Sequence, residues 1–330
     1  MVELYGGFKD FEKKIPYTRD TLQLVYSTSK NMEAVAVARL VEQGYLKYED
    51  KIASIWPDFG AKNKEDVTVE DLLRHEGGVA YFSDPQATFK HLIDDEKRYK
   101  LLIDQPHLWE GKKVRCYHAM TQGWYLNEIV RRVHPQKRTL GEIYSKEINP
   151  LRMLSFTLDY QKRTCLAGQP GSPLSKSSRI RNGENDFENG EVIHRSENPS
   201  FNGFTNALLP AKVTSCLANK GRIEDSVLIS EAGLTNAISD CIEEFDTCLF
   251  TKTCFSRGGF GVFTFPALGD VKFYGWPGMG GSFTLFNPEY NFAIAYVMNG
   301  AELSILTEGR AEGLIVAAFK AHMKLPCDKQ

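Results

Sequence analysis

Residues 26–42 read Tyr-Ser-Thr-Ser-Lys-Asn-Met-Glu-Ala-Val-Ala-Val-Ala-Arg-Leu-Val-Glu, and this stretch decides how the chain is interpreted. Ser27 and Lys30 lie three positions apart, at the start of an Ala/Val-rich segment that predicts a buried helix ending near Gly44. Residues at this spacing share a helix face and can touch. A serine hydroxyl becomes a good nucleophile when a base takes its proton, and burial favours the neutral amine of lysine. The alternative is that Ser27 only caps the helix.

The composition limits the class of protein. The chain has 330 residues, a formal net charge of -2 and an ordinary 42% of hydrophobic residues. This balance argues against a general nucleic-acid or membrane-surface binder. No apolar run approaches the ~20 residues of a membrane span, and the N-terminus lacks the basic and apolar regions of a signal peptide. We therefore do not expect the chain to bind nucleic acid or to contain a membrane span.

Cysteine and histidine usage predicts neither disulfides nor metal. The chain has seven cysteines, an odd number without a Cys-x-x-Cys pair, and seven scattered histidines. Free thiols in a reducing compartment such as the cytoplasm are favoured over a disulfide framework. The histidines lack the close spacing of zinc ligands, so no metal and no other cofactor is predicted.

Sheet segments are expected at both ends of the chain and helices between them. We expect strands at 2–7, 258–263, 283–286 and 292–298, and helices at 121–133, 140–148, 202–219 and 304–324 within a largely helical middle. Thr68 and Asp71 predict a capped helix start. The polar segment 176–198 predicts a mobile surface excursion.

This order predicts an α/β (α+β) fold. An antiparallel sheet from both termini would be flanked by helices, with a mainly helical domain inserted. Residues 1–60 and 210–330 would form the α/β part of a single domain 1–330, and residues 61–209 the helical insertion.

Two further motifs could carry chemistry. Tyr117 lies between a turn and a helix. A phenol beside a lysine ammonium could lose its proton more easily and act as a general base, although a core tyrosine is the simpler interpretation. Residues 274–282, Tyr-Gly-Trp-Pro-Gly-Met-Gly-Gly-Ser, form the densest glycine cluster. Strand-like flanks argue against a phosphate-binding loop; such glycines mark a close backbone approach to a ligand, or only a bulge.

Together these motifs resemble a known superfamily. Ser27-x-x-Lys30, Tyr117-His118-Ala119 and Trp276-Pro277-Gly278 are similar, in order, to the motifs of serine β-lactamases and penicillin-binding proteins. The class C-like β-lactamase-domain proteins and related carboxylesterases are the most similar branch. Further similar segments extend the resemblance over nearly the whole chain: 55–59, 69–78, 140–142, 199–207, 280–282 and 287–289.

The resemblance implies a role for each matching residue and a β-lactamase/transpeptidase-like fold. Ser27 would be the acylated nucleophile, Lys30 would help to move its proton, and Tyr117 would be the partner base that later activates water or an alcohol. The oxyanion hole would use the backbone N–H groups of Ser27 and Met279.

Substrate contacts are implied for the third motif and for His118. Trp276, Pro277 and Gly278 would line the substrate site, with Trp276 as an aromatic wall. His118 would be either a pocket residue or a structural donor, and the structural role is favoured.

The chain departs from the family pattern in three ways. Trp276 stands where β-lactamases have a lysine that binds the carboxylate of the drug, which disfavours true β-lactamase activity. Ala119 replaces an asparagine that contacts substrate amides. The family usually has a helix and a strand ahead of the segment resembling residues 2–7, and we expect Leu4 to lie beside an unpaired edge without them. A missing N-terminal segment could carry a targeting signal or anchor, so the compartment is left open.

The sequence therefore predicts a serine hydrolase that acts on an ester, amide or small peptide through an acyl-enzyme on Ser27. The alternative is a catalytically inactive β-lactamase-like protein with a binding or structural assembly role. The partner is expected to be a small molecule or peptide, and neither the acyl group, the leaving group nor the oligomeric state follows from the sequence.

Overall fold

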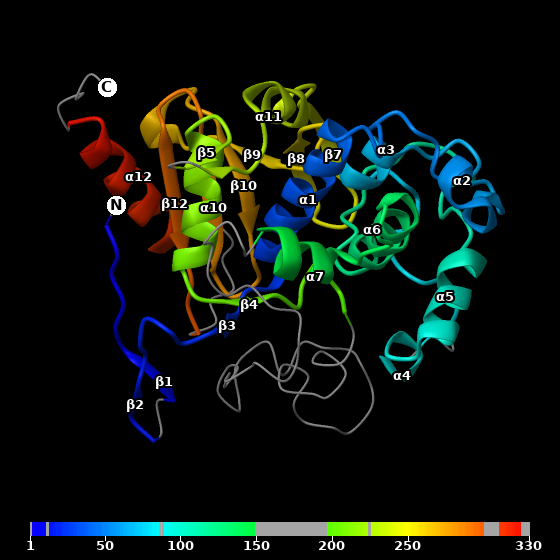
Figure 1. Ribbon diagram of the computed structural model, residues 1–330, viewed down its shortest axis with the longest axis horizontal. Coiled ribbons are helices and arrows are strands. Elements are labelled where there is room, and N and C mark those ends of the chain that lie inside the picture. The colour runs from blue at the N-terminus through cyan, green and yellow to red at the C-terminus, as the bar shows by residue number, and fades with distance from the viewer. Residues whose placement is uncertain are drawn as a thin grey trace.

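The computed structural model describes residues 2–10, 13–85, 87, 89–148, 197–223, 226–299 and 310–324. A six-stranded antiparallel sheet lies at the centre of this part of the chain, with strand order β12-β11-β10-β9-β8-β7 (Figure 1). The order in space follows the order in sequence, so the sheet is a meander of successive hairpins. Its strands are β7 (Ile242–Asp246), β8 (Thr251–Phe255), β9 (Gly261–Phe263), β10 (Phe273–Pro277), β11 (Phe283–Asn287) and β12 (Phe292–Tyr296).

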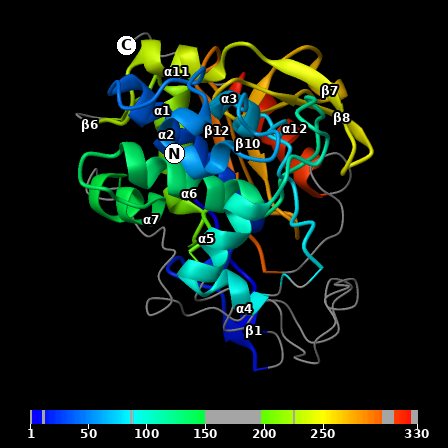
Figure 2. The ribbon, with the colours of Figure 1, turned by 90° about the vertical axis from the view of Figure 1, so that its right-hand side faces the viewer.

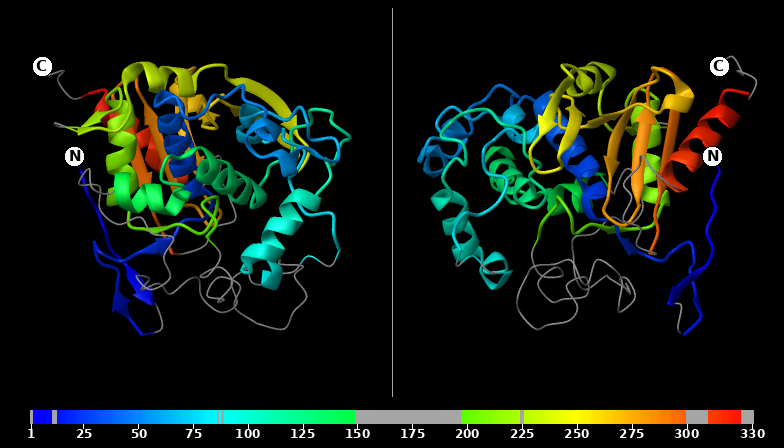
Figure 3. Two further views of the ribbon diagram at one scale, coloured as in Figure 1. Left: turned by 45° about the vertical axis from the view of Figure 1, so that its right-hand side comes forward. Right: turned by 180° about the vertical axis from the view of Figure 1, so that it is seen from behind.

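Helices cover both faces of this sheet. Phe286 and Tyr274 pack on one face with α1 (Lys30–Glu42) and α10 (Leu208–Ala218). Phe283 and Leu285 pack on the other face with Ile315 of α12 (Arg310–His322). Successive side chains of a strand point to opposite faces, so β11, buried along its whole length, serves two cores. Figure 3 shows the sheet between α10 and α12.

Most of the helices between α1 and α10 in the sequence gather beside the sheet, on the right in Figure 1, and Figure 2 turns this side toward the viewer. The helix predicted at 121–133 is confirmed as α6 (Thr121–Val133). The predicted cap is confirmed too, because Thr68 and Asp71 form a capping box at α3. The others are α2 (Ile52–Ile55), α3 (Val69–Leu73), α4 (Phe89–Leu92), α5 (Asp95–Asp104), α7 (Leu140–Ile143), α11 (Glu231–Ile238), and the short turns η1 (Tyr26–Ser29), η2 (Pro57–Gly60), η3 (Tyr144–Ile148) and η6 (Pro266–Leu268).

The N-terminal end contributes no strand to the six-stranded sheet described above, so the prediction of a sheet from both termini is wrong in this detail. Residues 2–7 are exposed and are not a strand. They bury no apolar face, and a strand needs one to offset the cost of ordering its backbone. The first strands instead form small separate pairs: β1 (Phe8–Asp10) with β2 (Ile15–Pro16), and β3 (Gln23–Leu24) with β4 (Phe204–Thr205).

Two other expectations need correction. The helix expected over 202–219 begins only at Leu208, because Phe204 and Thr205 pair with β3 and the Asn206 side chain accepts from the backbone N–H of Leu208 at 3.2 Å. Strands β7 and β8 were not predicted at all. β5 (Arg222–Ile223) and β6 (Ser226–Val227) form a further small hairpin.

Some expectations fall on residues that are not described. Almost all of the polar segment 176–198 lies outside the described residues, as do residues 304–309 of the last predicted helix. The boundaries near residues 60 and 210 between the two parts of the domain remain predictions. None of the described helices is long and apolar enough to cross a membrane.

Candidate active site

Ser27 lies in the tight turn η1, directly before α1. Tyr26 before it has φ of 46°, in the left-handed region that is costly for a residue with a side chain. Ser27 keeps exposed surface, whereas Thr28 and Ser29 are buried. Of the three neighbouring hydroxyl groups, only that of Ser27 is therefore open to a substrate.

The two buried hydroxyl groups hold the turn in place. Thr28 Oγ1 donates to the backbone oxygen of Ser282 at 3.0 Å, and Ser29 Oγ accepts from the N–H of Gly203 at 3.1 Å. One bond leads to the segment after β10 and the other to the segment before β4. The nucleophile turn is therefore fixed from two sides.

Gly278, just after β10, lies against this turn. A Cβ atom at Gly278 would lie 2.2 Å from the backbone oxygen of Val25 and 2.7 Å from Thr28 Oγ1, so no side chain fits there. The glycine therefore permits a close backbone approach to the nucleophile turn. Its N–H donates to the oxygen of Ser282 at 2.7 Å. Met279, the next residue, is 39% exposed at the surface beside the turn.

Lys30 is buried within this arrangement, with 1% of its surface exposed. Its Nζ donates to the backbone oxygens of Ala119 at 2.7 Å and Ser200 at 3.2 Å, and it lies 5.1 Å from the centre of the Tyr117 ring. Burial lowers the pKa of Lys30 to about 8, and the carboxylate of Glu33 opposes this shift. The neutral amine is therefore accessible near neutral pH, as expected from the apolar helix around it.

Tyr117 reaches the nucleophile from a different part of the chain. The side chain of Tyr117 interacts with that of Ser27. Burial raises the pKa of the Tyr117 phenol, and the interaction with Ser27 only partly opposes the rise. The expectation that this phenol loses its proton easily is therefore wrong. Its ring packs on Trp276 at 5.8 Å and on His75 at 4.8 Å between centroids, and these two rings shield part of it from water.

His118 has a structural role. Its Nε2 accepts from the N–H of Val79 at 3.2 Å, so its proton is on Nδ1, which donates to the oxygen of Cys116 at 2.6 Å. Burial lowers the pKa of His118 to about 3, and the neutral ring is retained. Of the two alternatives for His118, these contacts fit the favoured structural role and not a pocket residue, because both ring nitrogens are hydrogen bonded to the backbone.

Trp276, predicted as an aromatic wall of the substrate site, is packed largely against other side chains. It is only 5% exposed, its indole N–H donates to the oxygen of Gly259 at 2.9 Å, and its ring stacks on Phe255 at 5.2 Å as well as on Tyr117. The indole therefore supports Tyr117 from behind. Pro277 after it is half-buried.

The segment that carries Tyr117 is fastened to the hairpin of β7 and β8. Asp246 Oδ1 accepts from the N–H groups of Tyr117, Cys248 and Leu249 at 3.1, 2.9 and 3.0 Å. A disulfide joins Cys116 to Cys248. The expectation of free thiols is wrong for this pair, whose partners are 132 residues apart and meet only in the folded chain. Cys216, Cys241 and Cys254 are free; Cys165 and Cys327 lie outside the described residues.

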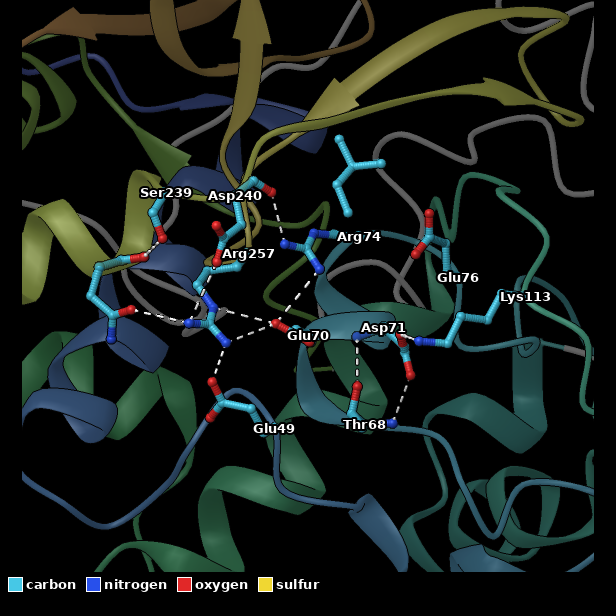
Figure 4. A network of polar contacts seen from close by, with 12 residues as sticks. Glu49, Thr68, Glu70, Asp71, Arg74, Glu76, Lys113, Ser239, Asp240 and Arg257 are labelled. Carbon is cyan, nitrogen blue, oxygen red and sulfur yellow. Dashed lines mark hydrogen bonds and ion pairs between the residues drawn. The ribbon is translucent and has the colours of Figure 1, made fainter.

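His75 connects the Tyr117 segment to α3. Its backbone oxygen accepts from the N–H of Cys116 at 3.0 Å, and its Nδ1 accepts from the N–H of His118 at 3.1 Å. A polar network holds α3 in place next to it (Figure 4). In this network Arg257 contacts Glu49 and Glu70, Arg74 donates to the oxygen of Asp240 at 2.8 Å, and Lys113 pairs with Asp71 at 2.6 Å.

The structure thus brings Ser27, Lys30 and Tyr117 together, as predicted, but sequence reasoning missed three residues that surround them. Glu33 could have been found, because an acid three residues after Lys30 in a buried helix is unusual. Nothing in the local sequence marks Ser200 or Asp246, which are placed by contacts with distant segments.

Comparison with known proteins tests the family and the fold of the chain. A family model described as Beta-lactamase matches residues 1–316. The esterase/beta-lactamase LipL of Mycobacterium tuberculosis is 26% identical over 329 residues, which cover 91% of this chain and 74% of that protein.

Two solved structures share the fold. A family VIII carboxylesterase superposes with a TM-score of 0.82 at 27% identity, covering 96% of this chain and 87% of the other. A penicillin-binding protein homologue from Caulobacter crescentus gives 0.80 at 28% identity, with 96% and 88% covered. These similarities confirm the predicted fold class.

Proposed function

The chain belongs to the beta-lactamase family, and on that premise we propose that it is a serine hydrolase that cleaves carboxylic esters through an acyl-enzyme on Ser27. One observation carries the proposal: the side chain of the half-buried Ser27 interacts with that of Tyr117, and the buried amine of Lys30 lies beside the Tyr117 ring. This is the arrangement of nucleophile and activating base that acyl transfer requires.

Acylation begins with Lys30 as the neutral amine. Ser27 Oγ forms a bond to the ester carbonyl carbon while its proton moves, by way of the Tyr117 hydroxyl, to Lys30. The carbonyl electron pair moves onto oxygen, and the N–H groups of Ser27 and Met279 stabilise the oxyanion. Each such donor contributes about 3 kcal/mol to transition-state stabilisation. The tetrahedral intermediate then expels the alcohol, which receives the proton from Lys30 through Tyr117.

Deacylation repeats the steps with water. A water molecule loses a proton towards Tyr117 and Lys30 as its oxygen attacks the acyl carbon. The bond between Ser27 Oγ and that carbon breaks, Ser27 recovers its proton, and the carboxylic acid leaves. Because the Tyr117 phenol keeps its own proton at rest, we assign it the transfer of protons and assign the base to Lys30.

The third motif favours an uncharged ester over a β-lactam. Trp276 offers no positive charge to a substrate carboxylate, and its one N–H is committed to Gly259. LipL is described as an esterase/beta-lactamase and the similar solved structure as a carboxylesterase, which also supports ester cleavage. An amide or small peptide is the next substrate to test.

The test uses a fluorophosphonate probe and a panel of short and long p-nitrophenyl esters, with nitrocefin and small peptides as further substrates. We expect covalent labelling at Ser27 and ester turnover, both lost in Ser27→Ala. The matched control Ser54→Ala changes an exposed serine of α2 and should behave as wild type. Labelling that persists in Ser27→Ala would overturn the assignment. A wild-type protein that is folded but neither labelled nor active would favour the non-catalytic alternative.

A further inference from the structure

Glu33 lies one helical turn beyond Lys30, and the steps above give it no role. Its side chain is buried, with 2% exposed, and the i, i+3 spacing puts it on the same side of α1 as Lys30. A carboxylate in the interior is costly unless hydrogen bonds or an opposite charge compensate for the lost water. The contacts of Glu33 therefore show how the cost of burying its carboxylate is compensated.

Ser200 connects Glu33 to Lys30. Its Oγ donates to the carboxylate, with oxygens at 2.8 and 3.1 Å, and its backbone oxygen accepts from Lys30 Nζ at 3.2 Å. The N–H of Ser200 is itself fixed by Asn198 Oδ1 at 2.9 Å. Carboxylate, serine and amine thus form one connected buried unit.

Helix α6 shapes the other side of this unit. A Cβ atom at Gly123 would lie 2.8 Å from Glu33 Oε1 and 2.4 Å from Asn198 Oδ1. The glycine leaves the space that the carboxylate and its neighbour occupy. The surroundings are therefore fitted to an acid at this position.

The titratable groups that interact with Glu33 are Lys30 on its own helix, Tyr117 from the loop before α6, and Tyr144 from η3. Burial raises the pKa of Glu33 to about 7, opposed by the charge of Lys30 and the bond from Ser200. The carboxylate in turn opposes the lowering of the Lys30 pKa. Each charge stabilises the other, so removing the carboxylate makes the ammonium form of Lys30 less stable.

We propose that Glu33 is a positioning residue for Lys30: its buried carboxylate, held by Ser200, sets how readily the amine releases the proton that it must lose before acting on Ser27. The inference rests on the proposed acyl-enzyme function. The carboxylate keeps the amine basic enough to take the proton of Ser27 and then to return it to the leaving alcohol.

The experiment measures the rate of fluorophosphonate labelling of Ser27 against pH. The rate should rise with pH as Lys30 loses its proton, and we call this part of the curve the rising limb. In Glu33→Gln, which keeps the size of the side chain and an oxygen for Ser200, we expect the rising limb to move to lower pH by about one unit. Glu33→Asp keeps the charge and should leave the limb close to its wild-type position. The matched control is Glu42→Gln, the same change at an exposed site of the same helix, where no shift is expected.

Two outcomes separate the claims. A wild-type protein that is not labelled at Ser27 at any pH contradicts the proposed function. If the wild type is labelled at Ser27 but the rising limb of folded Glu33→Gln lies at the same pH as in the wild type, the role of Glu33 is overturned and the proposed function stands.

If Glu33→Gln does not fold, Ser200→Ala takes its place. This change removes the hydroxyl from the carboxylate but keeps the backbone oxygen that holds Lys30. We expect a smaller shift in the same direction, because a carboxylate without that bond is protonated more readily. The absence of any shift would overturn the inference.

Discussion

The two halves of the candidate site are built in different ways. The nucleophile half, residues 26–33, comes from one short stretch in which a turn passes directly into α1. The tyrosine half consists of residues 115–118 and the hairpin 242–255, and its irregular backbone is fastened by Asp246, the Cys116–Cys248 disulfide and His75. The functional side chains of the first half come from one local stretch, although Ser282 and Gly203 also hold its turn, whereas the second half is assembled by contacts between distant segments.

The difference suggests that the two halves have different functions in catalysis. The helix buries Lys30 and thereby sets its proton affinity, which needs a dry surrounding more than fine placement. Tyr117 must instead meet Ser27 within hydrogen-bonding distance, and general acid–base catalysis depends on such geometry. We therefore expect changes in the nucleophile half to alter chemistry and pH dependence, and changes in the tyrosine half to alter stability and placement.

The largest effect is expected from Lys30→Met, which removes the proposed base from the nucleophile half. We expect kcat for a p-nitrophenyl ester to fall about 1000-fold, within the usual contribution of general acid–base catalysis. Lys51→Met, at an exposed lysine that only pairs with Asp66, is the matched control and should keep full activity. Circular dichroism confirms that both variants fold. A loss of less than tenfold would assign the base to another group.

The second effect belongs to the tyrosine half. Replacing both Cys116 and Cys248 by serine removes a bond that closes a long loop, which should lower the free energy of unfolding by about 3 kcal/mol. Urea unfolding measures this, with and without a thiol reductant. Reductant should destabilise the wild type to the level of the double variant and leave the variant itself unchanged.

Cys241→Ser is the matched control for the disulfide. Cys241 is free, and a serine hydroxyl can make the same bond to the oxygen of Ile238. We expect its stability to stay close to wild type. If wild type and the double variant unfold at the same urea concentration, the disulfide does not support the tyrosine half.

The same contrast explains what the sequence could predict. Ser27 and Lys30 were found because their spacing and the apolar run after them are local signals, and the helix at 121–133 and the Thr68 cap were found for the same reason. These features depend on neighbours within a few residues, so local sequence patterns predict them.

The tyrosine half could not be predicted in this way. Four of the five residues of β7 are exposed, so it lacks the alternation of buried and exposed residues that reveals a strand. The disulfide and the bond from the N–H of Tyr117 to Asp246 join residues more than 120 positions apart. The direction of the Tyr117 pKa shift was wrong for the same reason: the sequence showed a nearby ammonium but not the burial that outweighs it.

A third prediction concerns pH and sharpens the role of the nucleophile half. If neutral Lys30 is the base, kcat/KM should fall about tenfold per pH unit below the pKa of about 8 and level off above it. The raised pKa of Tyr117 adds no second limb in this range, because the phenol stays protonated. The measurement is a pH–rate profile of ester hydrolysis between pH 5 and 10, corrected for spontaneous hydrolysis. A flat profile would contradict a lysine base.

The smallest effect is expected from Thr68→Ala, a change to a local feature that belongs to neither half. Loss of the capping box at α3 should cost about 1 kcal/mol of stability, because the N–H of Asp71 loses its acceptor. The polar network around Arg257 and Glu70 still holds α3 in place, so kcat should stay within twofold of wild type. Thermal unfolding and ester turnover measure the two quantities on one sample. A loss of activity much larger than the loss of folded protein would show that His75, at the end of α3, passes small displacements on to Tyr117 through the backbone of Cys116 and His118. The tyrosine half would then extend into the helical part of the molecule.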